Sequence, residues 1–299
     1  MATNAAALLA AIGNTPLVTL DAGEARIFAK LESVNPGGSI KDRPVAAMLT
    51  RALAEGRFEG GRRLLDSSSG NAGISYAQLG AALGIPVTIV VPGNASAERL
   101  ERIRAHGAEL IVTDPIEGYD FALREAHRLA EAHPERYWHC DQYANPDNWR
   151  SHYEGTGGEI LAQLGDEPPD CLVAGVGTGG TLTGVGRRLR EANPRLWIVA
   201  AIPETFPGIE GLKPLGHPGD IVPAILDESL IDERVPVTLD EAAAQCRVLA
   251  REGLFVGPSS GAFVHVALKV AAAGRCRRIA TVLSDTGERY VSVGLWRSA

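Results

Sequence analysis

The chain has 299 residues, of which 45% are apolar and 22% are charged, and it contains no low-complexity tract. A chain of this length and composition folds into one or two globular domains with ample core. The net charge is −7, and acidic and basic residues are mixed along the chain, which excludes a basic surface for nucleic acid or anionic lipid. We therefore expect small molecules and other proteins as partners.

The apolar stretch at residues 5–12 is too short to cross a bilayer, and no Lys or Arg precedes Arg26 as a signal peptide would require. We expect a cytoplasmic protein with no membrane contact. The four cysteines are far apart and form no C-x-x-C motif, so neither a disulfide framework nor a metal site is expected. Small buried apolar residues are their expected role.

The first segment with chemical interest is residues 35–43, Asn-Pro-Gly-Gly-Ser-Ile-Lys-Asp-Arg. Its first four residues predict a turn, and the S-x-x-D spacing of Ser39 and Asp42 predicts a helix that begins at Ser39, with Lys41 in the first turn. The positive end of a helix dipole disfavours a cation by about 0.3–1 kcal/mol, so this position favours a neutral, nucleophilic lysine. Of the other three lysines, Lys30 and Lys269 are interpreted as surface cations.

Further along the chain, short β-branched runs alternate with helical patterns. We expect strands at 87–91, 109–112, 137–140, 171–174, 197–202 and 279–283, and helices at 97–106, 119–133, 148–164, 182–192 and 240–252. Such alternation is typical of parallel βαβ units with helices on both sheet faces, so we predict an α/β fold with open sheets. Turn residues at 145–148 suggest a domain boundary.

Three loops lie where strands lead into helices, the place where ligands bind in such folds. Residues 67–73, Ser-Ser-Ser-Gly-Asn-Ala-Gly, offer hydroxyl and backbone donors that suit a carboxylate, although an ordinary helix cap remains open. Residues 175–181, Gly-Val-Gly-Thr-Gly-Gly-Thr, suit a phosphate. They also match G-x-G-x-x-G, and Glu204 has the spacing of a ribose-binding acid, so a dinucleotide enzyme such as a nicotinamide-dependent dehydrogenase is the alternative. In residues 257–261, Ser259 or Ser260 either caps a helix or faces a ligand.

The three loops and the lysine together describe a site with an amine, a carboxylate pocket and a phosphate pocket. Pyridoxal 5′-phosphate fits these parts, because it carries a phosphate and bonds covalently to lysine.

With these motifs, and with those at residues 13–17, 141–145 and 287–290, the chain resembles almost end to end the cysteine synthases (O-acetylserine sulfhydrylases) of the cystathionine β-synthase/cysteine synthase group. These are fold type II pyridoxal-phosphate enzymes, similar to tryptophan synthase β. The resemblance implies two three-layer α/β/α domains with the cofactor between them. A smaller mobile domain at 35–145 carries the carboxylate loop, and a larger domain of residues 1–34 plus 146–299 binds the cofactor.

The resemblance also implies a role for each site residue. Lys41 holds the cofactor and later moves the Cα proton, Asn71 binds the ring hydroxyl, and Ser259 binds the pyridine nitrogen. The phosphate is bound by Gly177, Thr178, Gly179, Gly180 and Thr181, and the substrate carboxylate by Ser68, Ser69, Gln142 and the backbone of Ala72. The family commonly has threonine where this chain has Ser68 and Ala72. Pro44 is expected to remove a hydrogen bond from the lysine helix and distort its first turn.

The implied reaction is β-replacement on an activated L-serine by a sulfur nucleophile, which gives L-cysteine. Residues 206–214 and the ending Leu295-Trp296 look closer to the B-type enzymes, for which O-phosphoserine can replace O-acetylserine; Lys213 is then a candidate contact for that phosphate, or a plain surface residue. Cystathionine β-synthase-type and diaminopropionate-type reactions remain alternatives. A homodimer is implied, with serine acetyltransferase or a thiocarboxylated sulfur-carrier protein as possible partners.

Overall fold

The computed structural model describes residues 5–68, 70–216 and 222–296. Its contacts divide the chain into two compact units. Unit 1 comprises Met1–Ile12 and Lys41–Asn148, and unit 2 comprises Gly13–Ile40 and Trp149–Ala299. We expected residues 1–34 to belong wholly to the larger unit, but Leu8, Leu9 and Ile12 pack on the core of unit 1. No helix among the described residues is long and apolar enough to cross a membrane.

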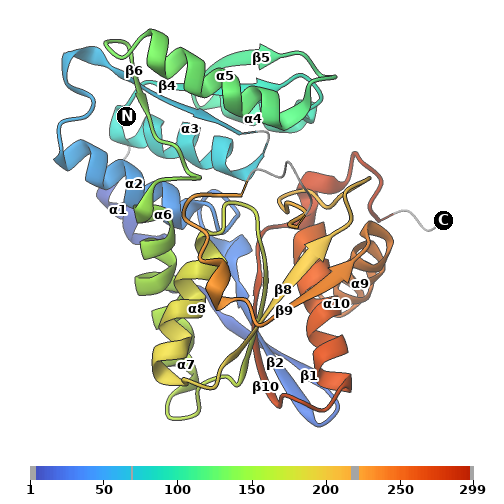
Figure 1. Cartoon of the computed structure of the whole chain (residues 1–299). Helices are drawn as coiled ribbons and strands as arrows, with labels where there is room; N and C mark the ends of the chain where they lie inside the picture. Colours follow the sequence, from blue (N-terminus) through green and yellow to red (C-terminus); the bar gives the residue numbers. More distant parts are fainter. Residues whose placement is uncertain (1–4, 69, 217–221, 297–299) are drawn as a thin grey trace. The chain divides into compact units, whose positions relative to one another are not determined.

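Unit 1 is built on a four-stranded parallel sheet in the order β5-β4-β3-β6 (Figure 1). Leu64 and Ile89 face a core formed with α2, α3 and α4, whereas their neighbours Leu65 and Val90 pack against Ala122 of α5. Helices therefore cover both faces, as the alternation of side chains along buried strands requires. The elements are α1 Ala5–Ala10, α2 Asp42–Ala54, β3 Arg63–Ser67, α3 Asn71–Leu83, β4 Val87–Pro92, α4 Ala97–Ala105, β5 Glu109–Thr113, α5 Gly118–Ala132 and β6 Tyr137–His139. Helix α6, Pro146–Ser151, begins in unit 1 and ends in unit 2.

Unit 2 contains a six-stranded sheet in the order β1-β2-β10-β7-β8-β9, parallel except for the antiparallel pair β1–β2. Val173 and Val199 face a core with α10, and Leu172 and Ile198 face a second core with α8. Figure 1 shows α9 and α10 on one face and α7 and α8 on the other. The elements are β1 Leu17–Ala22, β2 Ala25–Leu31, a π-helical segment His152–Gly157, α7 Gly158–Leu164, β7 Cys171–Gly175, α8 Gly180–Ala192, β8 Trp197–Pro203, β9 Glu233–Val237, α9 Leu239–Arg251, α10 Pro258–Ala272 and β10 Arg278–Leu283.

The expected start of the lysine helix was wrong. Ser39 does not cap a helix but forms an isolated antiparallel bridge with Asp285, and α2 begins at Asp42 with Lys41 as its N-cap residue. Pro44 is therefore the third helical residue. Because first-turn N–H groups have no intrahelical acceptor, Pro44 removes no helix hydrogen bond, and the expected distortion is absent from α2.

The interpretation of Lys30 as a surface cation was also wrong. Lys30 lies on β2 and is 0% exposed; its Nζ lies 2.7 Å from Glu159 Oε2 on α7 and donates to Gln163 Oε1 at 2.9 Å. It also donates to the carbonyl of Thr15 at 2.5 Å. A lysine can be buried when its charge is paired and its three hydrogens find acceptors, and Lys30 meets both conditions.

Candidate active site

In unit 1, the loop between β3 and α3 is closed by the hydroxyl of Ser68. Its Oγ accepts hydrogen bonds from Gly73 N at 2.9 Å and Gly70 N at 3.2 Å, while Ser68 N donates to Val90 O at 3.0 Å. A Cβ on Gly73 would lie only 3.3 Å from Ser68 Cβ, so this close approach favours glycine. Ser69, another expected carboxylate ligand, lies outside the described residues.

Asn71 and Ala72 are the first two residues of α3, a helix of 13 residues. Their backbone N–H groups have no intrahelical acceptor, and the helix dipole adds partial positive charge at this end. The Ala72 side chain is buried in the core of unit 1, so what Ala72 can offer a ligand is its backbone N–H. This arrangement is suited to binding a carboxylate.

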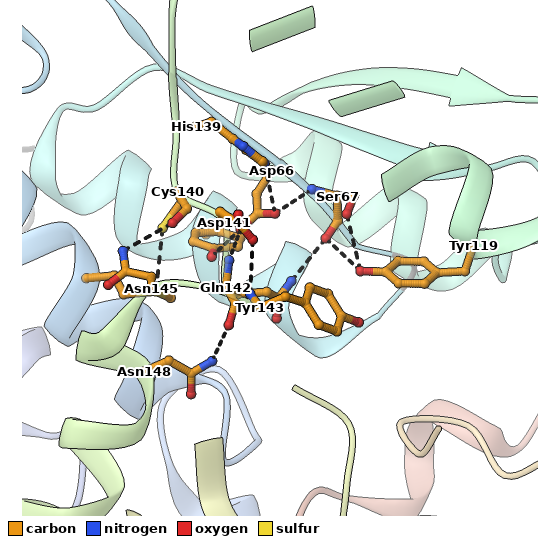
Figure 2. Close-up of polar contacts among 12 residues, drawn as sticks. Asp66, Ser67, Tyr119, His139, Cys140, Asp141, Gln142, Tyr143, Asn145 and Asn148 are labelled. Atoms are coloured by element: carbon orange, nitrogen blue, oxygen red, sulfur yellow. Dashed lines mark hydrogen bonds and ion pairs between the residues drawn. The ribbon is translucent and has the colours of Figure 1, made fainter. Parts of the chain in front are cut away.

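Gln142, in the loop after β6, is held against the C-terminal end of β3. Its Nε2 donates to Ser67 O at 3.0 Å, and its carbonyl accepts from Asn148 Nδ2 at 2.7 Å (Figure 2). An amide nitrogen carries two hydrogens, so one N–H of Gln142 remains for a substrate carboxylate. The sequence analysis assigned Gln142 to the carboxylate but did not anticipate that it also joins β3 to the β6 loop.

The centre of this network is Asp66, which was not singled out from the sequence. It is fully buried and accepts from Tyr76 Oη at 2.6 Å, Ser67 N at 2.7 Å and Gln142 N at 3.2 Å (Figure 2). Burial raises the pKa of Asp66 to about 7, and the hydrogen bond from Tyr76 opposes that rise. The carboxyl group thus fixes the ends of β3 and β6 beside the carboxylate loop.

Lys41 is the first residue of the second segment of unit 1, and the chain on each side of it is tied down. In unit 2, Ile40 N donates to Ser284 O at 2.8 Å, and Ser39 pairs with Asp285. In unit 1, the residue after Lys41, Asp42, accepts from Ser75 Oγ at 2.5 Å. The backbone of Lys41 therefore connects two anchored residues.

In unit 2, the glycine-rich segment after β7 forms a tight loop at the N-terminus of α8. Gly179 is the N-cap residue with a φ of +84°, which favours glycine, and a Cβ there would lie 2.8 Å from Leu226 Cβ. A Cβ on Gly177 would lie 2.5 Å from the carbonyl of Gly211. The first-turn N–H groups of α8, with the hydroxyls of Thr178 and Thr181, give a cradle that suits a phosphate.

Ser259 and Ser260 open α10, but neither caps it, because the N-cap residue is Gly257 without a side-chain cap. The Ser260 hydroxyl accepts from Ser284 N at 2.8 Å. Ser259 is only 6% exposed, yet its hydroxyl makes no hydrogen bond with any described residue. The residue is buried, but its hydroxyl has no partner among the described residues, so it can bond to a ligand.

The phosphate loop and Ser259 lie at the same edge of the unit 2 sheet. Strands β7 and β10 are parallel neighbours, the glycine loop follows β7, and the start of α10 is tied to the residue after β10. A phosphate cradle and a hydroxyl that makes no hydrogen bond to the described residues fit the phosphate and the ring nitrogen of pyridoxal phosphate. Glu204, which the dinucleotide interpretation assigned to a ribose, instead accepts a hydrogen bond from Leu239 N at 3.3 Å.

The chain belongs to the family of pyridoxal-phosphate dependent enzymes, whose model matches residues 8–285. It is 42% identical to the cysteine synthase of Aquifex aeolicus, over 97% of this chain and 91% of that protein. The crystal structure of an O-ureido-L-serine synthase matches with a TM-score of 0.89 and 36% identity, covering 98% of this chain and 95% of that one.

An O-acetylserine dependent cystathionine β-synthase from Helicobacter pylori matches with a TM-score of 0.85 and 32% identity, covering 97% of this chain and 98% of that one. These findings confirm the expected fold type and the pyridoxal phosphate cofactor, and the dinucleotide interpretation of the glycine loop was wrong.

Proposed function

We propose that this enzyme forms L-cysteine by β-replacement on an activated L-serine, O-acetylserine or O-phosphoserine, with a sulfur nucleophile. The similarity to a cysteine synthase carries the proposal, together with the Ser259 hydroxyl, which makes no hydrogen bond to the described residues. A serine bonded to the pyridine nitrogen, where other pyridoxal-phosphate enzymes have an aspartate, leaves that nitrogen largely unprotonated. The weaker electron sink favours elimination and replacement at the β-carbon over transamination.

The residues of unit 2 bind the cofactor in this proposal. Gly177, Thr178, Gly179, Gly180 and Thr181 hold the phosphate, and Ser259 holds the ring nitrogen. Bound there, the cofactor stabilises negative charge at the substrate Cα. Asn71 of unit 1 is assigned to the ring hydroxyl.

The residues of unit 1 bind and deprotonate the substrate. The substrate carboxylate accepts hydrogen bonds from Ser68, Ser69, the backbone N–H of Ala72 and the free N–H of Gln142. The amine of Lys41 holds the cofactor aldehyde before substrate binds and, once released, takes the proton from the substrate Cα.

Lys213 is a candidate for recognition of a phosphate leaving group. Its backbone N donates to the carbonyl of Val176 at 2.7 Å, so the residue lies beside the phosphate loop of unit 2. A cation at this place favours O-phosphoserine, as in the B-type enzymes.

Cystathionine formation is the second candidate, because the Helicobacter pylori enzyme named above uses O-acetylserine for that product. We also propose a homodimer, with serine acetyltransferase or a thiocarboxylated sulfur-carrier protein as a further partner.

The test is Lys41→Ala. We expect the loss of the covalent cofactor linkage that borohydride fixes, seen by mass spectrometry, and a fall in β-replacement rate of at least 10²–10⁴-fold, roughly the range for a general base. The control is Lys269→Ala, an exposed lysine whose loss leaves both intact. Identifying the product from each serine ester with sulfide or homocysteine selects the substrate pair. A Lys41→Ala protein that keeps the linkage and the rate contradicts the proposal.

A further inference from the structure

Two histidines and an aspartate come together in unit 1. His127 lies on α5, His139 is the last residue of β6, and Asp141 follows two residues later. One ligand atom from each lies within 4.8 Å of the others. The two imidazole rings have centroids 4.6 Å apart and planes at 81°.

The distances suit a single divalent ion. Zinc–nitrogen and zinc–oxygen bonds of about 2.0–2.2 Å in a tetrahedron place the ligand atoms about 3.3–3.5 Å from one another. Small side-chain rotations bring atoms within 4.8 Å to that separation. Two imidazoles with one carboxylate are a common protein ligand set for zinc, with a fourth position left for water.

A second acidic residue, Asp66, faces the ring of His139. Asp66 Oδ1 lies 3.9 Å from His139 Nε2, and this nitrogen is buried without a hydrogen-bond partner among the described residues (Figure 2). A metal on Nδ1 leaves the Nε2–H to approach Asp66, the carboxylate–histidine–metal arrangement that orients a ligand ring.

The three residues are carried by packed elements rather than by a free loop. Strand β6 pairs with β3, His139 standing opposite Leu65, and α5 packs on the same sheet through Ala122 and Ala126. Asp141 has a φ of +49°, a left-handed conformation that few residues other than glycine adopt, and its Oδ1 accepts from Tyr143 N at 3.3 Å. The cluster is therefore held in a defined geometry.

We propose that His127, His139 and Asp141 form a zinc site that joins α5 to the end of β6. None of the three ligands is assigned to cofactor or substrate, although Asp141 directly precedes Gln142, and the proposal does not depend on the proposed reaction. The sequence analysis expected no metal because these ligands are spread over 15 positions, without the close spacing of a zinc motif.

The experiment is zinc titration of the tag-free holoenzyme, freed of metal with a chelator and of unbound cofactor by gel filtration. Calorimetry gives the stoichiometry and affinity, and Co²⁺ in place of Zn²⁺ reports the coordination geometry through its visible absorption. We expect one Zn²⁺ per chain and a zinc-dependent rise in the Tm of the wild-type protein, because zinc binds the folded site.

The test variants are His127→Ala, on a helix surface, and Asp141→Asn, which keeps a residue type that tolerates positive φ. Each should lose at least about tenfold in zinc affinity. The matched control is His133→Ala, six positions along from His127, which should bind zinc as the wild type does. Circular dichroism in metal-free buffer checks the fold of each variant. Substoichiometric zinc in the wild type, or wild-type affinity in both test variants, overturns the proposal.

Discussion

The backbone N–H of Ser284 donates to the hydroxyl of Ser260 at 2.8 Å, so the residue after β10 is tied to the first turn of α10. The carbonyl of the same Ser284 accepts from Ile40 N, the residue before the lysine. Ser260 thus has a structural task, whereas the hydroxyl of the adjacent Ser259 makes no hydrogen bond to the described residues. Two neighbouring serines of the same motif are distinguished by their partners.

This difference predicts opposite results for two alanine substitutions. Ser260→Ala leaves the partly buried Ser284 N–H without its acceptor and should lower the free energy of unfolding of the cofactor-free protein by about 1–1.5 kcal/mol. Ser259→Ala should change that quantity by no more than about 0.5 kcal/mol, since no protein bond is lost. Ser259→Ala should instead shift the absorption spectrum of the bound cofactor and reduce turnover. Urea unfolding and absorption spectroscopy check both; a spectral shift confined to Ser260→Ala would reverse the assignment.

Elements whose signal is local were predicted well from the sequence. The buried parallel strands β4 and β7, for example, are continuous runs of β-branched and apolar residues, and both were predicted to within one residue at each end. The strands β1, β2 and β9 were missed. Their sequences mix charged residues such as Arg26 and Lys30 with apolar ones. Strand β1 pairs with the adjacent β2, but β2 also pairs with β10 near the other end of the chain, and β9 pairs with β8 across a long connection.

The glycine loops were predictable for the same reason, because glycine and turn chemistry are encoded within a few residues. The start of α2 was not, since a bridge to Asp285 engages Ser39 in place of a cap. The roles of Asp66 and of the His127–His139–Asp141 cluster also depend on residues that only the folded sheet brings together. Sequence patterns therefore located the ligand loops, while their supporting contacts required the structure.

The buried pair Lys30–Glu159 predicts a large effect on stability. Lys30→Met removes one charge and leaves Glu159, 16% exposed in its side chain, without its partner at 2.7 Å. Breaking a buried pair in this way costs about 3–5 kcal/mol. The double variant Lys30→Met/Glu159→Gln should recover part of that loss, because no unpaired charge remains.

Urea unfolding of Lys30→Met, of Glu159→Gln and of the double variant measures the coupling between Lys30 and Glu159. The control is Lys269→Ala, whose exposed pair with Glu241 at 3.1 Å should contribute no more than about 1 kcal/mol. Equal, small effects of Lys30→Met and Lys269→Ala would show that Lys30 is not buried as a charge.

Glu241 predicts a pH dependence of stability at the start of α9. Its Oε2 accepts from Thr238 N at 2.8 Å, and Glu241 N donates to Thr238 Oγ1 at 3.2 Å, a capping box. The hydrogen bond from Thr238 N, with Lys269 nearby, lowers the pKa of Glu241 from 4.5 to about 2. A carboxyl whose folded-state pKa is depressed contributes stability above its unfolded pKa and loses it as pH falls toward the folded one.

Glu241→Gln should therefore lower the free energy of unfolding by up to about 1 kcal/mol at pH 7, since the carboxylate is partly exposed and solvent screens it. The difference between wild type and variant should shrink as the pH falls from 4.5 toward 2, because the carboxyl is by then protonated in the unfolded state and half protonated in the folded state. Urea unfolding at a series of pH values measures the difference, and Glu101→Gln on the exposed face of α4 is the control. If the difference in free energy of unfolding stays constant between pH 4.5 and 2, the charge of Glu241 does not stabilise the capping box of α9.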